Sequence, residues 1–171
     1  MDTSAMFSFS YGLYVVSADS GDHVAGCLIN TGLQVTGEPL QVAVTVNKQN
    51  FTTGVIDAAG HFALTVVTKA ADMPYIGRFG FRTSADFDKF ADIPVERTVL
   101  GDLYTTLDAC AVVACTVVQR LDLGSHIMFV GEVADAQRIP GDEPITYAYY
   151  HSVLKGKTPP KASSYIADQE A

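Results

Sequence analysis

The sequence predicts a mainly β domain with short helices, and three observations lead to that fold class. Residues 40–46 alternate apolar with small or polar side chains at a strict period of two, as in a half-buried strand. Two long segments rich in β-branched residues, 109–121 and 125–139, are separated only by Asp-Leu-Gly. Helical stretches are few and short in a chain of 171 residues. Closure removes exposed sheet edges, so these features favour a closed or nearly closed antiparallel barrel, although periodicity alone leaves a sandwich open.

The chain begins with a predicted hairpin. Residues 13–17 and 23–29 have the composition of strands, and the Asp-Ser-Gly-Asp sequence at 19–22 suits the tight turn between them. We therefore expect these two strands to pair.

A strand–helix–strand unit follows, with residues 40–46 as its first strand. Asn50 is expected to cap a short helix over 51–59, and Gly60 to end it. Residues 61–67 then return to a strand.

The middle of the chain, residues 69–90, predicts short helices with a loop. Thr83 opens a Thr-Ser-Ala-Asp sequence ahead of Phe87 and Phe90, which indicates a helix start. Beyond it, the long hairpin of 109–121 and 125–139 should supply core side chains. They are Val112, Val113, Val117, Val118, Ile127, Phe129 and Val133.

The last elements are a short helix around 146–153 and a tail. Pro159 and Pro160 cannot continue a helix, so we expect a flexible tail from about residue 160. No repeat or break in composition marks a linker, and residues 1–171 are expected to form a single domain.

The amino-acid composition limits the classes of binding partner that the protein can have. A net charge of -8 with a pI near 4.7 argues against a nucleic-acid or anionic-membrane surface, which needs clustered Lys and Arg. Residues 1–9 resemble neither a signal peptide nor a membrane span, so a cytoplasmic protein is expected. Cys27, Cys110 and Cys115 lack metal-ligand spacing and are expected to be reduced thiols, with no metal site.

Two polar segments flank the clearest strand and are candidate binding elements. Residues 27–36 concentrate amides and hydroxyls near a glycine, which suits the edge of a polar heterocycle or simply a polar connection between strands. Residues 46–53 join a strand end to a helix start and include Lys48, a suitable phosphate cradle or simply a capped helix. Either segment alone is compatible with both interpretations.

The order of several motifs resembles the flavin reductase-like family of FMN-binding split barrels, over roughly residues 6–165. The similarity is strongest to the flavin reductase domain of high-molecular-weight rubredoxins, to NADH:FMN oxidoreductases and to flavoredoxins. The motifs are Tyr-Gly-Leu-Tyr-Val-Val at 11–16, Asn-Thr at 30–31 with Gln-Val-Thr at 34–36, Asn-Lys-Gln-Asn-Phe-Thr at 47–52, Phe-Gly-Phe at 79–81 with Asp-Lys-Phe at 88–90, residues 124–133, and residues 145–157.

This resemblance implies a six-stranded antiparallel split β-barrel that forms a homodimer, with FMN, or FAD as the alternative, near the subunit interface. It implies that the flavin ring lies against Leu28, Ile29, Asn30 and Thr31. The ribityl chain and phosphate would be held by Asn47, Lys48, Asn50 and Thr52.

The resemblance also implies two elements near the reacting face of the flavin. Phe79, Gly80 and Phe81 match the segment that approaches the flavin, and a buried aromatic pair is an alternative interpretation. His126 matches a histidine near the expected nicotinamide position, without an assigned acid or base role. No catalytic residue is expected, because hydride passes directly between the two rings.

The implied function is that of an NAD(P)H:flavin reductase, which passes electrons from NADH or NADPH through FMN to free flavin or a protein acceptor. A flavoredoxin-like electron carrier with little direct nicotinamide activity is the alternative, and a split-barrel protein that binds haem or another ligand is a third. High-molecular-weight rubredoxins continue into a CxxC-ligated iron domain that this sequence does not contain, so a rubredoxin-like acceptor would be a separate molecule. The sequence also lacks the GxGxxG nucleotide fingerprint, so a nicotinamide would have to bind in the flavin cleft itself.

Overall fold

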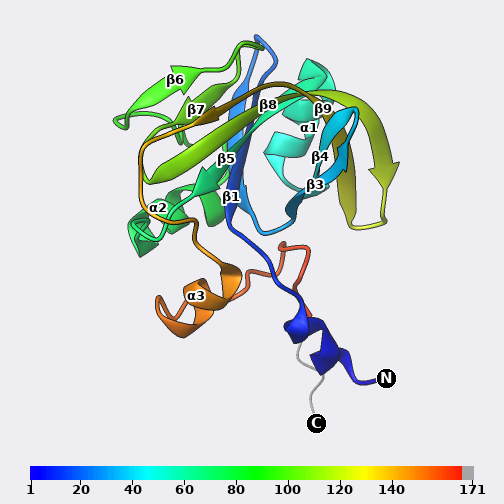
Figure 1. Ribbon diagram of the computed structural model, residues 1–171, viewed down its shortest axis with the longest axis vertical. Helices are drawn as coiled ribbons and strands as arrows, with labels where there is room; N and C mark the ends of the chain where they lie inside the picture. The colour runs from blue at the N-terminus through cyan, green and yellow to red at the C-terminus, as the bar shows by residue number, and fades with distance from the viewer. Residues whose placement is uncertain (167–171) are drawn as a thin grey trace.

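The fold is dominated by one antiparallel sheet, seen in a computed structural model that describes residues 1–166 (Figure 1). The sheet has seven strands in the order β2-β1-β5-β8-β9-β4-β3, and β6 and β7 form a separate pair. The strands are β1 (Tyr14–Asp19), β2 (Val24–Ile29), β3 (Gly32–Gly37), β4 (Leu40–Asn47), β5 (His61–Val67), β6 (Val95–Arg97), β7 (Leu103–Thr105), β8 (Ala109–Asp122) and β9 (His126–Arg138). The helices are the 3-10 helix η1 (Thr3–Ser8), α1 (Phe51–Ala59), α2 (Met73–Gly80) and α3 (Tyr147–Ser152).

The two edge strands of the sheet, β2 and β3, are neighbours in the sequence. Only Asn30 and Thr31 join them, so the opposite edges must approach each other at this point, and the sheet curls towards closure. A hydrogen bond from the Thr45 amide to the Thr31 carbonyl, 3.1 Å long, ties the connection to β4. The edges do not pair with each other, so the curled sheet stays split beside Asn30 and Thr31.

Both faces of the sheet carry a hydrophobic core. Successive strand residues point to opposite faces, and in β1 the adjacent Val15 and Val16 are both fully buried in different clusters. Val16 packs in the cluster that contains Ile56 of α1. Val15 packs in the cluster that contains α2, through Ile76. The two helices therefore cover opposite faces of the curled sheet.

The mainly β, antiparallel fold class is confirmed, as are the first hairpin, the strand–helix–strand unit, the long hairpin and α3. The main sheet has seven strands where the resemblance implied six. The additional β6–β7 pair was not predicted, because its two strands are only three residues long.

Residues 32–37 form a strand rather than part of a loop. They pair with β4 as the edge strand β3, and most of their side chains are exposed, so they carry no alternation of buried and exposed residues. The polar connection between strands is therefore limited to Asn30 and Thr31.

The predicted helix start at Thr83 is wrong. Residues 81–90 form turns held by side chains: the Thr83 hydroxyl accepts from the Ala85 amide, and the Ser84 hydroxyl bonds to both backbone groups of Gly26 on the edge strand β2. These local bonds compete with helix formation and cover part of that edge.

Two smaller predictions also need correction. Val118 is 44% exposed, because the register shifts between Val117 and Gln119 and this end of β8 extends beyond the core. Asn50 precedes α1 and Gly60 ends it with a φ of 72°, as expected, but the Asn50 side chain makes no capping bond. Its amide lies instead 3.7 Å from the Cys27 sulfur.

The residues beyond α3 return towards the sheet. Residues 157–164 run back to the point where β2, β3 and β4 meet, and residues 167–171 of the expected flexible tail lie outside the described part of the chain. In residues 1–166, no helix is long and apolar enough to cross a membrane.

Candidate functional site

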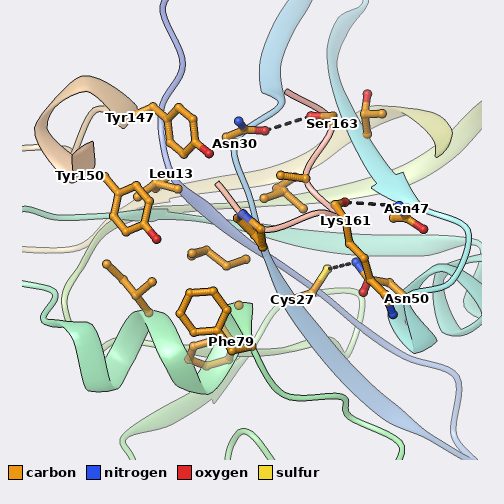
Figure 2. A pocket seen from close by; sticks show the side chains of 18 of the residues that line it. Leu13, Cys27, Asn30, Asn47, Asn50, Phe79, Tyr147, Tyr150, Lys161 and Ser163 are labelled. Carbon is orange, nitrogen blue, oxygen red and sulfur yellow. Dashed lines mark hydrogen bonds between the residues drawn. The ribbon is translucent and has the colours of Figure 1, made fainter. Parts of the chain in front are cut away.

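A cavity of about 70 Å³ lies beside the Asn30–Thr31 connection, where the split sheet faces α2, α3 and the C-terminal segment (Figure 2). Most of the residues expected to hold a flavin lie on its wall. These are Leu28, Ile29, Asn30, Asn47, Asn50, Phe79, Gly80 and Phe81. The wall also contains Leu13, Cys27, Thr45, Ile76, Arg82, Tyr147, Tyr150, Pro159, Lys161, Ala162 and Ser163.

One side of the cavity is polar and comes from the strand ends. Asn30 follows β2 and Asn47 ends β4, and both are buried, with 5% and 9% of their surface exposed. Asn50 follows at the start of α1. The structure thus brings three amide side chains from two separated segments to one wall, each able to donate and accept hydrogen bonds.

The other side is apolar and aromatic. Phe79 is 1% exposed and packs against Tyr75 and Phe90, with ring centroids 5.2 and 5.5 Å away. Tyr147 and Tyr150 of α3 stack on each other at 5.6 Å and close the wall (Figure 2). An apolar wall facing a row of amides is the arrangement that a flat heterocycle with one polar edge requires.

Thr45 is a member of the site that the sequence prediction missed. Its side chain lies on the cavity wall with 6% of its surface exposed, and its hydroxyl has no hydrogen-bond partner among residues 1–166. A buried hydroxyl without a partner costs free energy, and a ligand can supply the partner. The period of two in β4 could have found it, because Thr45 shares a strand face with Asn47.

The Cys27 thiol on the wall and the Lys89 ammonium group behind it are both buried. Burial raises the pKa of Cys27, partly opposed by the Lys89 charge and by a hydrogen bond to Thr52. Burial also lowers the pKa of Lys89 to about 8. The Lys89 ammonium donates to the Phe79 carbonyl at 2.9 Å, so it supports the aromatic wall from behind.

Four of the expected site residues do not lie on the cavity wall. Thr52 is 2% exposed and bonds to the Cys27 thiol, and the Thr31 hydroxyl donates to the Asn30 side chain at 3.2 Å. Lys48 forms an exposed ion pair with Asp122, and its side chain lines a separate groove at the start of α1. Asn50 borders both the groove and the cavity.

His126 is the fourth, and it lies beside Asn47 in the strand register. Its Nε2 donates to the Lys161 carbonyl at 3.2 Å, and its Nδ1 accepts from the Ser125 hydroxyl at 2.8 Å. The same Lys161 carbonyl accepts from the Asn47 amide at 3.4 Å. His126 thus contacts the segment that covers the cavity.

The wall contributed by α3 and the C-terminal segment was also missed. Tyr147 and Tyr150 stand three apart on α3 and could have been recognised as an aromatic face of that helix. No local pattern could place Lys161 or Ser163 at the site, because their partners are far away in the sequence.

Comparison with known proteins identifies what the chain is similar to. The sequence pattern described as the flavin reductase like domain matches residues 6–157. A ferric-chelate reductase (NAD(P)H) of Archaeoglobus fulgidus is 41% identical over 166 residues, which cover 97% of this chain and 98% of that protein. A high molecular weight rubredoxin of Moorella thermoacetica is 38% identical, over 99% of this chain and 74% of that protein.

Solved structures share the fold at lower identity. The flavin reductase HpaC, in a complex with NADP+, has a TM-score of 0.71 at 20% identity over 84% of this chain and 89% of its own. A flavoredoxin of Methanosarcina acetivorans has a TM-score of 0.69 at 20% identity over 77% of this chain and 70% of its own. At these identities the structural likeness concerns the fold alone.

Proposed function

The chain belongs to the flavin reductase like domain family, and from that premise we propose that it is an NAD(P)H-dependent flavin reductase whose cofactor is FMN. The observation that carries the proposal is the cavity at the split of the sheet, with amides on one side and an aromatic wall on the other. The Thr45 hydroxyl on this wall has no partner among residues 1–166. FAD shares the same ring and is the second candidate cofactor.

The residues at the cavity fit a flavin ring. The pyrimidine edge of the ring carries both donors and acceptors, which Asn30, Asn47 and Thr45 can pair. Its dimethylbenzene end is apolar and suits contact with Leu28, Phe79 and the other apolar side chains of the wall. Ile29, Thr31, Gly80 and Phe81 complete the proposed ring site.

The phosphate and ribityl chain would extend from the cavity into the groove at the start of α1. Asn50 borders both hollows, and Lys48 lines the groove. The positive end of the α1 dipole favours an anion at this place. Lys48 can turn to a phosphate at small cost, because an exposed ion pair such as that with Asp122 contributes only about 0–1 kcal/mol. Thr52 lies deeper and is proposed to support the site through Cys27.

The chemistry that a bound flavin supplies is acceptance of a hydride from a dihydronicotinamide and release of two electrons to an acceptor. The chain's own residues have binding and orienting tasks. The amides fix the plane of the ring, Phe79 and the tyrosines exclude water from one side, and Lys89 holds the Phe79 carbonyl in place. No side chain has to act as acid or base in this proposal.

NADH or NADPH is the proposed donor, and it would stack on the flavin near His126. The name of the Archaeoglobus relative includes NAD(P)H, and HpaC has been solved with NADP+, which supports a nicotinamide donor for this family member. Such a donor, together with free thiols at Cys27, Cys110 and Cys115, agrees with a cytoplasmic location.

A homodimer is part of the proposal. Large apolar side chains are exposed on strands β3, β4 and β8 and on the turn between β8 and β9. In the sheet, these strands and β9 are neighbours in the order β8-β9-β4-β3. They are Leu33, Val35, Leu40, Val118, Leu121 and Leu123, each between 42% and 52% exposed. We propose that some of these side chains contact the second copy of the chain.

A flavoredoxin-like electron carrier is the second candidate. It is favoured by the similarity to a high molecular weight rubredoxin and by the fold shared with a flavoredoxin. A carrier would hold FMN in the same cavity and receive electrons from another redox protein, such as a rubredoxin-like partner, rather than from a nicotinamide.

Anaerobic titration tests the proposal. Purified protein reconstituted with FMN should bleach near 450 nm on addition of NADH or NADPH, with a rate that saturates in nicotinamide concentration. Bound FMN that is reduced slowly and without saturation would favour the carrier. A chain that binds neither FMN nor FAD would contradict both candidates.

A further inference from the structure

The C-terminal segment Pro159–Ser164 lies across the proposed flavin site and binds the polar groups that the flavin would need (Figure 2). We infer that this segment is a built-in competitor of the flavin, so that the segment has to leave the cavity before the flavin can bind there. The inference rests on the proposed function, since it concerns the same cavity.

The first observation is the set of hydrogen bonds that the segment makes. The Asn30 amide donates to the Ser164 hydroxyl, and its carbonyl accepts from the Ser163 hydroxyl at 2.9 Å. The Lys161 carbonyl accepts from both Asn47 and His126. The Thr31 hydroxyl also contacts the Ser163 hydroxyl.

These bonds occupy the hydrogen-bonding groups of residues that are expected to bind the flavin. The Asn30 carbonyl accepts from Thr31 as well as from Ser163, so both of its lone pairs are engaged, and one of its two amide protons is bound to Ser164. The same side chain cannot make a full set of bonds to a flavin while the segment is in place. Flavin and segment are therefore alternatives at Asn30.

The second observation is the space that the segment leaves. The cavity measures about 70 Å³, whereas pockets for drug-sized ligands measure about 300–1,000 Å³. Pro159, Lys161, Ala162 and Ser163 form part of its wall. A three-ring ligand needs this part of the wall to move away.

The third observation is that the segment has a firm base and an end held by hydrogen bonds without a large apolar side chain. At the base, Tyr150 donates to the Lys157 carbonyl at 3.0 Å, and Tyr147 donates to the Thr158 hydroxyl at 2.7 Å. From Pro159 to Ser164 no large apolar side chain is present, and Lys161 and Ser163 are exposed. The end of the segment can therefore detach without disturbing α3.

Limited trypsin digestion of the full chain, read by mass spectrometry, tests the displacement directly. Added FMN should speed cleavage after Lys161, because the segment leaves the cavity, and should slow cleavage after Lys69, because ligand binding stabilises the rest of the fold. Slower cleavage at both sites would mean that the segment closes over the flavin, and would overturn the inference.

A second measurement uses the variant Ser163→Ala/Ser164→Ala, which removes side-chain bonds of the segment and leaves Asn30 intact. FMN should bind tighter, by about fivefold for each competing hydrogen bond lost, and the association rate should rise. Ser152→Ala, at an exposed position on α3, is the matched control and should leave affinity unchanged. Thermal unfolding of each variant establishes that it is folded.

The outcomes separate this inference from the proposed function. If the double variant binds FMN more weakly while the unaltered chain binds it normally, the inference that the segment competes with the flavin is wrong. The flavin reductase proposal is unaffected by that result. Absence of FMN and FAD binding in every variant overturns the proposed function, and the inference fails with it.

Discussion

The ammonium of Lys89 donates a hydrogen bond to the backbone carbonyl of Phe79, at 2.9 Å, from a side chain that is only 2% exposed. The bond has a counterpart in the opposite direction, because the Arg78 guanidinium donates to the carbonyls of Lys89 and Ala91. The end of α2 and residues 89–91 thus hold each other through two side chains. This pair of contacts fixes the aromatic wall of the cavity.

Lys89→Met should change how stability depends on pH. Burial lowers the pKa of Lys89 from 10.5 to about 8, so between these values the unfolded chain binds more protons than the folded chain. The free energy of unfolding contributed by Lys89 therefore rises from pH 8 to 10.5, by about 3 kcal/mol in total. Urea unfolding at several pH values should show this rise in the unaltered protein relative to Lys89→Met. If the free energies of unfolding of the two proteins change with pH in parallel, the pKa of Lys89 is not lowered in the folded protein.

Thr45→Val should have opposite effects on stability and on ligand binding. The hydroxyl is buried without a partner among residues 1–166, so the nearly isosteric valine should stabilise the ligand-free chain by about 1 kcal/mol. If the hydroxyl bonds to a flavin, FMN affinity should fall about fivefold. Thermal unfolding and fluorescence titration with FMN measure the two effects.

A matched control for Thr45 is Thr65→Val. Its hydroxyl is also buried without a partner in the described part of the chain, but it does not line the cavity. The control should stabilise the ligand-free chain similarly and leave FMN affinity unchanged. Equal loss of affinity in both variants would remove Thr45 from the proposed flavin site.

Lys48 and Asp122 provide a second pair of variants. Lys48→Ala should weaken FMN binding about fivefold to tenfold, because a charge-assisted bond to phosphate is lost. Asp122→Asn should leave binding unchanged or strengthen it slightly, because Lys48 no longer forms its ion pair. Riboflavin, which has no phosphate, should bind all three proteins equally. Weaker FMN binding by both variants would point to a structural role of the ion pair.

Prediction from sequence succeeded where the signal was local. The strands with strong alternation or many β-branched residues, such as β4 and β8, and the glycine-terminated helix α1 were predicted with nearly correct bounds. β3 was missed because an exposed edge strand buries neither face and so carries no period of two. The outward position of Val118 depends on a bulge in the pairing of β8 with β9, which no pattern in β8 alone encodes.

For the candidate site, only the positions of the expected residues can be compared with the structure. Leu28 to Asn30, Asn47, Asn50 and the Phe79–Phe81 segment could be proposed from ordered motifs, and all of them lie on the cavity wall. Thr45 was missed because a threonine in a strand is unremarkable until its hydroxyl is found unpartnered. The contact between Asn30 and Ser163 spans 133 residues, so only the folded chain reveals it.

Phe79→Ala and Phe81→Ala should separate the structural and binding roles of the aromatic wall. Phe79 is 1% exposed and packs against Tyr75 and Phe90, so its truncation should destabilise the chain by about 3–5 kcal/mol. Phe81 is 55% exposed on the same wall, and its truncation should change stability by less than about 0.5 kcal/mol. If Phe81 contacts the flavin, FMN affinity of Phe81→Ala should still fall several-fold. Urea unfolding measures stability, and FMN titration measures affinity. If a fully stable Phe81→Ala protein binds FMN with unchanged affinity, Phe81 does not belong to the site. Phe79 would then remain as a core residue whose aromatic packing shapes the wall.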